Sequence, residues 1–323
     1  MTAATMEVHL TDADLTSALR ADAGRGLTAT PKHLPPKWFY DARGSELFER
    51  ITALPEYYPT RTERALLERV VGEIARLAGA EVLVELGAGS AAKTRLLLTA
   101  LTERGALHTY VPQDVSSAAL RAAAAEVAEE FPGLTVHGVV SDFTDTLTAM
   151  PRGGRRMIAF LGGTIGNLVP AERRAFLTGI HDVLEPGERL LLGAGLVVDP
   201  DVLVPAYDDA EGVTAAFNRN VLHVLNHRLG ADFEPDKFDH VALWDAEHEW
   251  IEMRLAARED MTVTVADLDL VVEFARGEQM RTEISAKFRL DGLRAELGGS
   301  GFAVEQVWTD PDDRFALVLA TRT

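Results

Sequence analysis

The chain has 323 residues, a formal net charge of −18, 47% hydrophobic residues and no cysteine. This length is enough for one large or two modest domains with apolar cores. Without cysteine, disulfides, cysteine zinc sites and thiol nucleophiles are excluded. The strong negative charge repels nucleic acid and anionic membranes, so we expect neither as a partner. Because the polar start is unlike a signal peptide and no apolar run reaches the roughly 20 residues that span a bilayer, we expect a cytoplasmic protein. We also expect a monomer.

The first part of the chain, up to residue 60, combines helix signals with proline breaks. We expect residues 34–40 to be extended and residues 44–53 to form a short amphipathic helix that ends near Pro55. Residues 54–59 read Leu-Pro-Glu-Tyr-Tyr-Pro, which fits neither a helix nor a strand. The clustered aromatic residues could serve packing alone, but a proline-flanked tyrosine pair in a loop is also a candidate for function.

From Thr62 onward, helical and strand patterns alternate. The predicted helices cover residues 62–77, 91–101, 117–131 and 171–184, and the predicted strands cover residues 82–86, 109–113, 134–140, 156–161 and 189–196. Such alternation predicts a parallel sheet with helices on both faces. Ligands of these sheets lie beyond the carboxyl ends of the strands, so the residues there are the first candidates for a site.

The alternation stops after residue 196, and the block that follows is too long for a loop inside a compact domain. In this block, helical patterns cover residues 201–208 and 212–229. Strand patterns cover residues 241–257, 263–274 and 279–288, two of them interrupted by turns or bulges. A helix at 291–297 and strands at 302–308 and 315–320 then give the sheet an antiparallel finish. We therefore predict an α/β fold in two parts. Residues 61–198 and 287–323 form a Rossmann-like cofactor domain, and residues 1–60 and 199–286 form a second α+β lobe that binds the substrate.

The most informative motif is Glu85-Leu-Gly-Ala-Gly-Ser90, between a strand and a helix. Its glycines let the backbone approach a nucleotide-type cofactor, because no Cβ is in the way. The acid at the strand end favours S-adenosylmethionine, since a carboxylate there meets the cationic end of this cofactor and repels a pyrophosphate. Gly87, Gly89 and Ala92 also satisfy a relaxed dinucleotide pattern, so the motif alone leaves an NAD-dependent oxidoreductase open.

Residues at the ends of the next two strands narrow this choice. Asp114 could accept both ribose hydroxyls of either cofactor, or it could cap the following helix. Asp142 and Phe143 follow the third strand, where an acid can accept from the adenine amino group and an aromatic ring can stack on its face. This pair is typical of methyl-donor sites and has no place in the dinucleotide fingerprint. S-adenosylmethionine is therefore the predicted cofactor.

Other polar residues carry two interpretations each. Lys93 could reach the methionine carboxylate of the cofactor or remain a solvated lysine. Asn167 ends a glycine-rich segment after the fourth strand, where it could bind a carboxylate or serve as a turn residue. His223, His227 and His240 lack the spacing and the acidic partner of a metal motif. We expect no metal and assign these histidines to the surface or to helix packing.

Beyond these motifs, the sequence is similar to a known family over roughly residues 20–323. It resembles the actinobacterial L-histidine Nα-methyltransferases of ergothioneine biosynthesis. The stretches that carry the resemblance are LPPKWFYD at 34–41, LPEYYPTRTE at 54–63, FLGGTIGNL at 160–168, AYDDA at 206–210, VTAAFNRN at 213–220 and TEISAKF at 282–288. The resemblance implies a class I methyltransferase fold. It also implies trimethylation of the α-amino group of L-histidine to hercynine, with S-adenosylmethionine as donor.

The resemblance also implies roles for individual residues. The methyl donor would be held by Gly87, Lys93, Asp114, Asp142 and Phe143, beside Glu85 and Gly89 of the same loop. Asn167 and Tyr207 would hold the substrate carboxylate, and Tyr57, Glu283 and Ser285 would contact the imidazole. Tyr40, Phe48, Gly162 and Met253 would line the pocket near the amine and the ring.

The residue types fit this chemistry. Glu283 can accept from an imidazole N–H, and Ser285 lies on the same side if the segment is a strand. Methyl transfer to an amine asks mainly for alignment and exclusion of water, so we expect Tyr40 to position the amine and no residue to be an obligate base. Two alternatives remain open: a methyltransferase for another amino acid, and an S-adenosylmethionine-binding protein without turnover.

Overall fold

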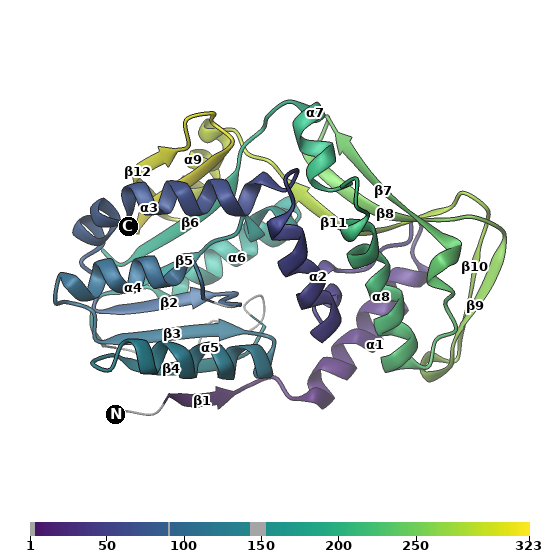
Figure 1. Cartoon of the computed structure of the whole chain (residues 1–323), viewed down its shortest axis with the longest axis horizontal. Coiled ribbons are helices and arrows are strands. Elements are labelled where there is room, and N and C mark those ends of the chain that lie inside the picture. Colours follow the sequence, from purple (N-terminus) through teal and green to yellow (C-terminus); the bar gives the residue numbers. More distant parts are fainter. Residues whose placement is uncertain (1–3, 90, 143–152) are drawn as a thin grey trace. The chain divides into compact units, whose positions relative to one another are not determined.

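The computed structural model describes residues 4–89, 91–142 and 153–323, which form two compact units. Unit 1 consists of Met1–Leu10, Pro59–Val197 and Phe288–Thr323, and unit 2 of Thr11–Tyr58 and Val198–Lys287. Figure 1, coloured along the sequence, shows that each unit combines segments that are far apart in the chain.

Unit 1 contains an eight-stranded sheet in the order β1-β4-β3-β2-β5-β6-β13-β12. The strands are β1 (Thr5–Val8), β2 (Val82–Leu86), β3 (Thr109–Asp114), β4 (Thr135–Val140), β5 (Arg156–Phe160), β6 (Arg189–Gly195), β12 (Phe302–Thr309) and β13 (Phe315–Arg322). The strands from β1 to β6 pair in parallel, and β13 pairs antiparallel with both β6 and β12. The predicted parallel sheet with an antiparallel finish is therefore confirmed.

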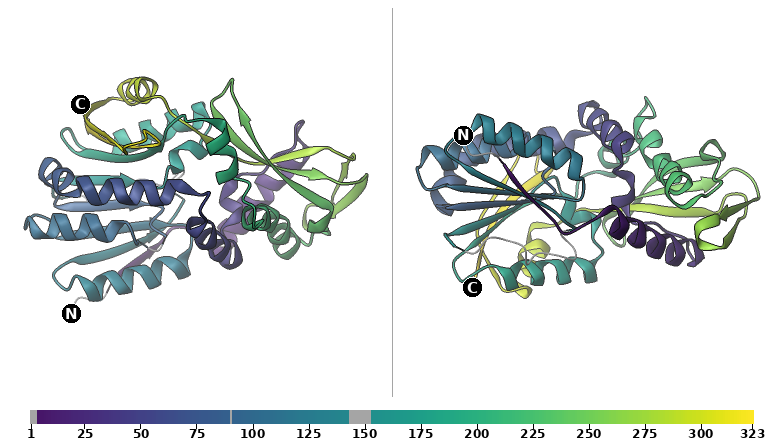
Figure 2. Two further views of the ribbon diagram at one scale, coloured as in Figure 1. Left: turned by 45° about the horizontal axis from the view of Figure 1, so that its top comes forward. Right: turned by 90° about the horizontal axis from the view of Figure 1, so that it is seen from below.

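Helices cover both faces of this sheet, as the right-hand view of Figure 2 shows. They are α3 (Tyr58–Ala78), α4 (Thr94–Glu103), α5 (Ser117–Glu130), α6 (Pro170–Val183) and α9 (Leu290–Gly299), with the short 3-10 turn η2 (Thr164–Asn167). Strands β2 and β5 are buried along their whole length because helices lie on each side. The helix predicted from residue 91 begins at Thr94 instead, since Ala91 has a left-handed φ of 53° that no helix can contain.

Unit 2 packs helices against two small antiparallel sheets, β11-β8-β7 and β10-β9. Its helical elements are α1 (Asp12–Thr28), η1 (Pro36–Phe39), α2 (Ala42–Ala53), α7 (Pro200–Leu203), η3 (Val204–Ala206), α8 (Val213–Leu229), η4 (Pro235–Lys237) and η5 (Ala266–Leu268). Its strands are β7 (Phe238–Asp245), β8 (Trp250–Ala257), β9 (Met261–Val265), β10 (Leu270–Phe274) and β11 (Gln279–Ala286). The two long strand patterns predicted over 241–257 and 263–274 are each a pair of strands separated by a turn, with left-handed Glu249 and Asp269 at these turns.

One predicted domain boundary is wrong at the start of the chain. Residues 1–60 were expected to belong to the second lobe, whereas β1 pairs in parallel with β4, with Thr5 opposite His137, and so belongs to unit 1. The strand has only four residues and its burial does not alternate, because it lies at the edge of the sheet. Such a strand leaves no periodic pattern in the sequence.

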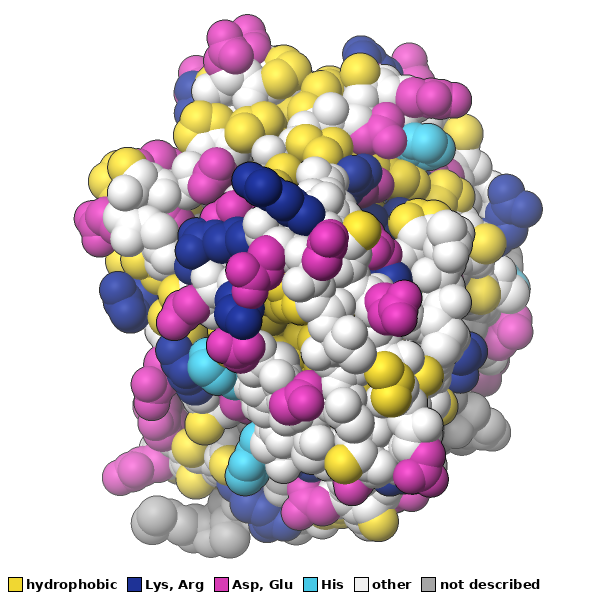
Figure 3. All heavy atoms as spheres, turned by 90° about the vertical axis from the view of Figure 1, so that its right-hand side faces the viewer, with side chains coloured by type: hydrophobic (Ala, Val, Ile, Leu, Met, Phe, Trp, Pro, Cys, Tyr) yellow, Lys and Arg dark blue, Asp and Glu magenta, His cyan; other side chains and the backbone are white. Residues whose placement is uncertain are grey.

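The surface shows no single-sign charge field on the face drawn in Figure 3, where acidic and basic side chains are interspersed. Among the residues that the structure describes, no helix is both long enough and apolar enough to cross a bilayer.

The packing of α1 depends on the small size of Gly26. A Cβ at this position would collide with the carbonyl oxygen of His33, whose own N–H donates to the Gly26 carbonyl at 3.1 Å. We expect Gly26→Ala to lower the free energy of unfolding by about 1–3 kcal/mol, because the backbone must move apart. Gly24→Ala in the same helix is the matched control, because no described neighbour lies within 4 Å of its added Cβ. It should be neutral or stabilise by up to about 1 kcal/mol. Urea unfolding of both variants checks this, and equal effects would contradict the packing argument.

Candidate functional site

The glycine loop after β2 leaves its backbone open to a ligand. Gly87 and Gly89 have positive φ angles of 71° and 50°, a conformation that other residues rarely adopt. The Gly87 N–H donates to the Gln113 carbonyl at 2.9 Å, which anchors the loop to the end of β3. Among the described residues, no neighbour would lie within 4 Å of a Cβ on Gly89. This geometry fits the predicted approach of a nucleotide-type cofactor.

Asp114, at the end of β3, is held by the same loop. Its two carboxylate oxygens accept from the Gly89 N–H at 3.0 Å and from the Ser116 N–H at 2.9 Å. Burial raises the pKa of Asp114, and these backbone N–H groups act in the opposite direction. Asp114 therefore makes the capping-type contact before α5 and also fixes the glycine loop. A carboxylate has about four lone-pair sites, so Asp114 can still accept from a ribose hydroxyl.

Glu85 makes different contacts from those expected. Its side chain is only 5% exposed and accepts from the Tyr110 hydroxyl at 2.5 Å and from the Thr94 hydroxyl. Burial raises the pKa of Glu85 to about 7, against the effect of these two hydrogen bonds. These contacts favour a positioning role, in which Glu85 ties the end of β2 to β3 and to the first residue of α4, over direct contact with a cofactor.

Lys93 is paired with an acid that sequence reasoning missed. Its ammonium forms an ion pair with Glu63, whose side chain is fully buried. The Glu63 carboxylate also accepts from the Gly162 N–H, at 2.8 and 3.0 Å. Lys93 is therefore not the solvated lysine of the alternative interpretation, and Glu63 links it to the loop after β5. The only signal in the sequence was the position of Glu63 at the end of the tyrosine-proline stretch.

The remaining predicted residues of unit 1 lie at strand ends. Half-buried Asp142 follows β4, and half-buried Asn167 ends η2, which begins after the left-handed residues Gly162 and Gly163. Phe143, predicted to stack on the adenine, lies outside the described residues. Among the described residues of unit 1, the contacts thus bring Asp114 together with the glycine loop, and Lys93 together with Gly162 through Glu63.

In unit 2, two predicted residues meet a lysine that was not predicted. The hydroxyls of Tyr207 and Ser285 lie 2.8 Å apart. The Lys287 ammonium donates to the Tyr207 oxygen at 2.7 Å and to the Ser285 oxygen at 2.8 Å. All three residues are buried, and burial raises the pKa of Tyr207 while it lowers the pKa of Lys287. The Tyr207–Ser285–Lys287 triangle is the most closely connected polar group among the described residues of the candidate site.

Glu283 lies on β11 two residues before Ser285, so the expected strand spacing is present. Burial raises the pKa of the half-buried Glu283 to about 8, against the attraction of the Lys287 charge. Near neutral pH this carboxyl group therefore retains a proton for much of the time. A ring N–H of the substrate, or an imidazolium, would supply the partner that favours the ionised form.

A bulge and a buried histidine set the positions of these residues. The β11–β8 register shifts between Arg281 and Glu283, and Thr282 at this shift donates to Asn218 Oδ1 at 2.6 Å. Asn218 also lies 2.8 Å from His240 Nδ1, while His240 Nε2 lies 2.8 Å from the Tyr207 carbonyl. His240 is thus the neutral tautomer that donates to Tyr207, and burial lowers its pKa. His240 therefore packs against α8 through Asn218, as the helix-packing interpretation predicted, and it also positions Tyr207.

Aromatic rings surround the predicted amine-positioning residue. Tyr40 packs edge-on against Phe48 at 5.6 Å and against Phe217 at 5.5 Å between ring centroids. Tyr57 lies 6.2 Å from both Phe48 and Tyr207. Phe217, on α8, was not predicted, although it stands in one of the stretches that carry the family resemblance. Tyr40, Phe48, Tyr57, Tyr207 and Phe217 together form an aromatic cluster.

The neighbours of Tyr40 in the chain are held by the same helix. Asn220 of α8 donates to the Phe39 carbonyl at 3.2 Å and to Asp41 Oδ1 at 2.7 Å. Asp41 in turn caps α2 by accepting from the Gly44 N–H at 2.7 Å. Asn220 therefore fixes the short segment that carries Tyr40.

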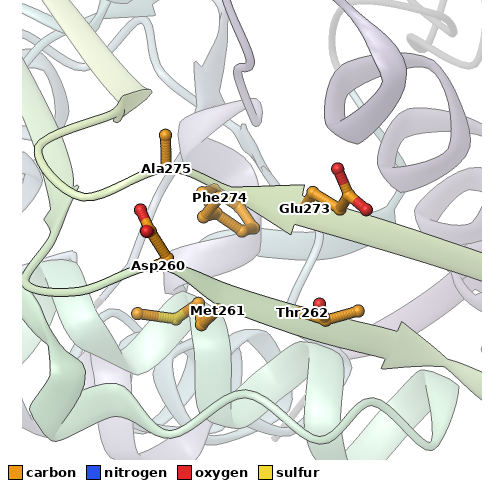
Figure 4. Close-up of a pocket in the computed structure, with 6 residues that line it drawn as sticks. All are labelled: Asp260, Met261, Thr262, Glu273, Phe274 and Ala275. Atoms are coloured by element: carbon orange, nitrogen blue, oxygen red, sulfur yellow. The ribbon is translucent and has the colours of Figure 1, made fainter.

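Among the described residues, Met253 and a surface hollow of unit 2 add no polar side chain to the candidate site. Met253 pairs in register with Glu283 and is 2% exposed, so its side chain belongs to the apolar core. The surface hollow in Figure 4 is lined by Asp260, Met261, Thr262, Glu273, Phe274 and Ala275, none of which is a predicted site residue. Over the described part of the chain, no group of three or more histidine, aspartate or glutamate residues could hold a metal ion.

Comparisons with known proteins identify the family. A family model described as "Histidine-specific methyltransferase, SAM-dependent" matches residues 19–322. The chain is 54% identical to a "Histidine N-alpha-methyltransferase" of Mycolicibacterium smegmatis and 52% identical to one of Mycobacterium tuberculosis, each over 94% of this chain and 95% of the relative. It is also 34% identical to "Ergothioneine biosynthesis protein 1" of Neurospora crassa, over 70% of this chain and 25% of that protein.

These matches cover nearly the whole chain and confirm the resemblance seen in the sequence. They also decide against the dinucleotide alternative, since the family model describes the use of S-adenosylmethionine. The chain therefore belongs to the family of histidine-specific, S-adenosylmethionine-dependent methyltransferases.

Proposed function

We propose that this protein trimethylates the α-amino group of L-histidine to give hercynine, the first step of ergothioneine biosynthesis. The observation that carries the proposal is the polar set of Glu283, Ser285 and Tyr207 in unit 2, in a chain that belongs to this family. Glu283 and Ser285 offer an acceptor and a hydroxyl to the two nitrogens of an imidazole.

The residues of unit 1 fit the methyl donor. When bound, S-adenosylmethionine supplies a methyl group on an electrophilic sulfonium. We assign Asp114 to the ribose hydroxyls, Asp142 and Phe143 to the adenine, and Lys93 to the methionine carboxylate, with Gly87 and Gly89 giving backbone access. The positive φ angles of Gly87 and Gly89, and the contact of Asp114 with the Gly89 N–H, support this fit. Glu85 positions α4, and Glu63 positions Lys93.

The residues of unit 2 fit the amino acid. We assign Tyr207 to the substrate carboxylate, the role that the family resemblance also gives to Asn167. The imidazole ring is contacted by Glu283, Ser285 and Tyr57. A ligand without ring N–H groups would leave buried polar atoms unpaired, which is costly and gives strong selectivity.

The chain's own residues then have a modest chemical task. The amine must lose a proton before each transfer, and the protein must hold it in line and keep water away. We assign Tyr40 to positioning the amine, with Phe48 beside it in unit 2, and assign no residue as an obligate base. The aromatic cluster suits the growing positive charge of a methylated ammonium through cation–π contact. The proposal includes no metal, because the sulfonium is already an electrophile.

The first experiment is mass spectrometry of the products formed from L-histidine and S-adenosylmethionine by the purified protein. We expect mono-, di- and trimethylated histidine with L-histidine and none with other amino acids. Methylation of another amino acid in place of L-histidine would assign another substrate, and donor binding without any product would indicate a protein without turnover.

Glu283→Gln tests whether the Glu283 carboxylate binds the imidazole ring of the substrate. We expect the kcat/KM for L-histidine to fall by about ten- to a hundred-fold, because a charge-assisted hydrogen bond is lost. Glu273→Gln on β10, also an acid on a strand of unit 2, is the matched control and should behave as the wild type. Equal kinetics of Glu283→Gln and wild type would remove Glu283 from the substrate site.

The raised pKa of Glu283 has a consequence for stability. An ordinary glutamate titrates near 4.5, whereas Glu283 titrates near 8 in the fold. Between these values the folded protein holds a proton that the unfolded chain has lost, so stability falls as pH rises through this interval. A glutamine in its place has no proton to lose. We expect the free energy of unfolding of Glu283→Gln, relative to that of the wild type, to rise by an amount on the order of 2–4 kcal/mol between about pH 5 and about pH 9. Urea unfolding across this range measures the difference, and a gap independent of pH would refute the assignment.

A further inference from the structure

Lys287, directly after β11, is a buried lysine to which the proposed function gives no role. Its residue is 7% exposed, and its ammonium donates to the Tyr207 and Ser285 hydroxyls at 2.7 and 2.8 Å. It also lies 4.9 Å from the centroid of the Tyr207 ring. Burying a charged lysine costs free energy, so a structure that retains it there has a use for the charge or for its hydrogen bonds.

The hydrogens of the triangle can be counted. An ammonium only donates, so Lys287 occupies one lone pair on each hydroxyl oxygen. Tyr207 and Ser285 share one hydrogen bond, which uses one of their two protons. One hydroxyl proton is left for a ligand, and it is that of Tyr207 when Ser285 donates to Tyr207. The lysine thus makes the pair of hydroxyls a net donor, which suits an anion.

The charges of the neighbouring residues also indicate that Lys287 favours an anion. The residues that the family resemblance assigns to the substrate carboxylate, Tyr207 and Asn167, are neutral, and ionised Glu283 would repel an anion. A carboxylate that accepts from Tyr207 would lie one hydrogen bond away from the Lys287 ammonium. Burial lowers the pKa of Lys287, while Tyr58 and Glu283 act in the opposite direction. A bound carboxylate would add a further counter-ion that favours the ammonium.

We propose that Lys287 is a specificity-determining positioning residue whose ammonium selects the α-carboxylate of the substrate through the Tyr207 hydroxyl. This inference rests on the proposed function and names the group that gives the carboxylate subsite its charge. It predicts that the protein discriminates L-histidine from histamine, which has the same ring and amine but no carboxylate, and that this discrimination depends on Lys287.

The test compares the Kd values of L-histidine and histamine by calorimetry in the presence of S-adenosylhomocysteine. Lys287→Met removes the charge and keeps an unbranched side chain of similar length. We expect the ratio of the histamine Kd to the L-histidine Kd to fall by about ten-fold or more in this variant. Lys32→Met is the matched control, because Lys32 is also a lysine of unit 2 in contact with an aromatic ring and an acid, Phe274 and Glu278. It should leave the ratio unchanged.

A ratio that stays at the wild-type value in Lys287→Met, while both ligands weaken equally, would show a structural role only and overturn the inference. If Lys287→Met does not fold, Lys287→Gln carries the same comparison. The 15N resonance of the Lys287 ammonium in wild-type protein is a further readout, and it should shift with L-histidine but not with histamine. Equal shifts with both ligands would also overturn the inference.

The outcomes separate this inference from the proposed function. Wild-type protein that binds L-histidine without methylating it would refute the proposed function, and the Kd ratio would still decide the role of Lys287. Wild-type protein that binds neither ligand would refute both.

Discussion

The arrangement of unit 2 depends on the need to pair the amide N–H groups of two buried asparagines on one helix. Asn218 of α8 donates to the Arg254 carbonyl at 3.0 Å and contacts His240 and Thr282, and Asn220 donates to Phe39 and Asp41. A buried amide without partners costs about 1–3 kcal/mol, so these contacts restrict the segments they join. One side of the network fixes the bulge before Glu283 and, through His240, the backbone of Tyr207. The other fixes the segment that carries Tyr40.

Unit 1 meets the same constraint with charges in place of amides. Its central strands are buried by helices on both faces, so an acid at the end of β2 must be paired or protonated. Glu85 is paired with two hydroxyls, and Glu63 with an ammonium and a backbone N–H. These pairs join the ends of β2 and β5 to the starts of α4 and α3. These contacts therefore hold the carboxyl ends of the parallel strands, where a ligand of such a sheet lies.

Desolvation acts on the polar residues of unit 2 in opposite directions. It raises the pKa of Glu283 to about 8 and lowers the pKa of Lys287, so each group is moved toward its neutral form. A substrate with a cationic or N–H-bearing ring and an anionic carboxylate would reverse both effects, because each charge would gain a partner. The free protein thus carries a desolvation cost that a zwitterionic amino acid with a polar ring can offset. Within the same unit, the aromatic cluster would suit, under the proposed function, an ammonium that can no longer donate hydrogen bonds once it is fully methylated.

The sequence by itself determined the features that arise from local pattern. Strand and helix alternation defined the sheet of unit 1, glycines with positive φ marked the loop after β2, and two-residue spacing placed Glu283 and Ser285 on one side of a strand. Long matching stretches indicated the family. Tertiary structure decided which distant side chains meet. Lys93 pairs with Glu63, 30 residues away, and Lys287 contacts Tyr207 across 80 residues. Glu85 faces Tyr110 and Thr94, β1 joins the far edge of the sheet, and His240 supports Tyr207. Such pairings depend on strand order, on register and on the bulge at Thr282, and none of these leaves a periodic signal along the chain.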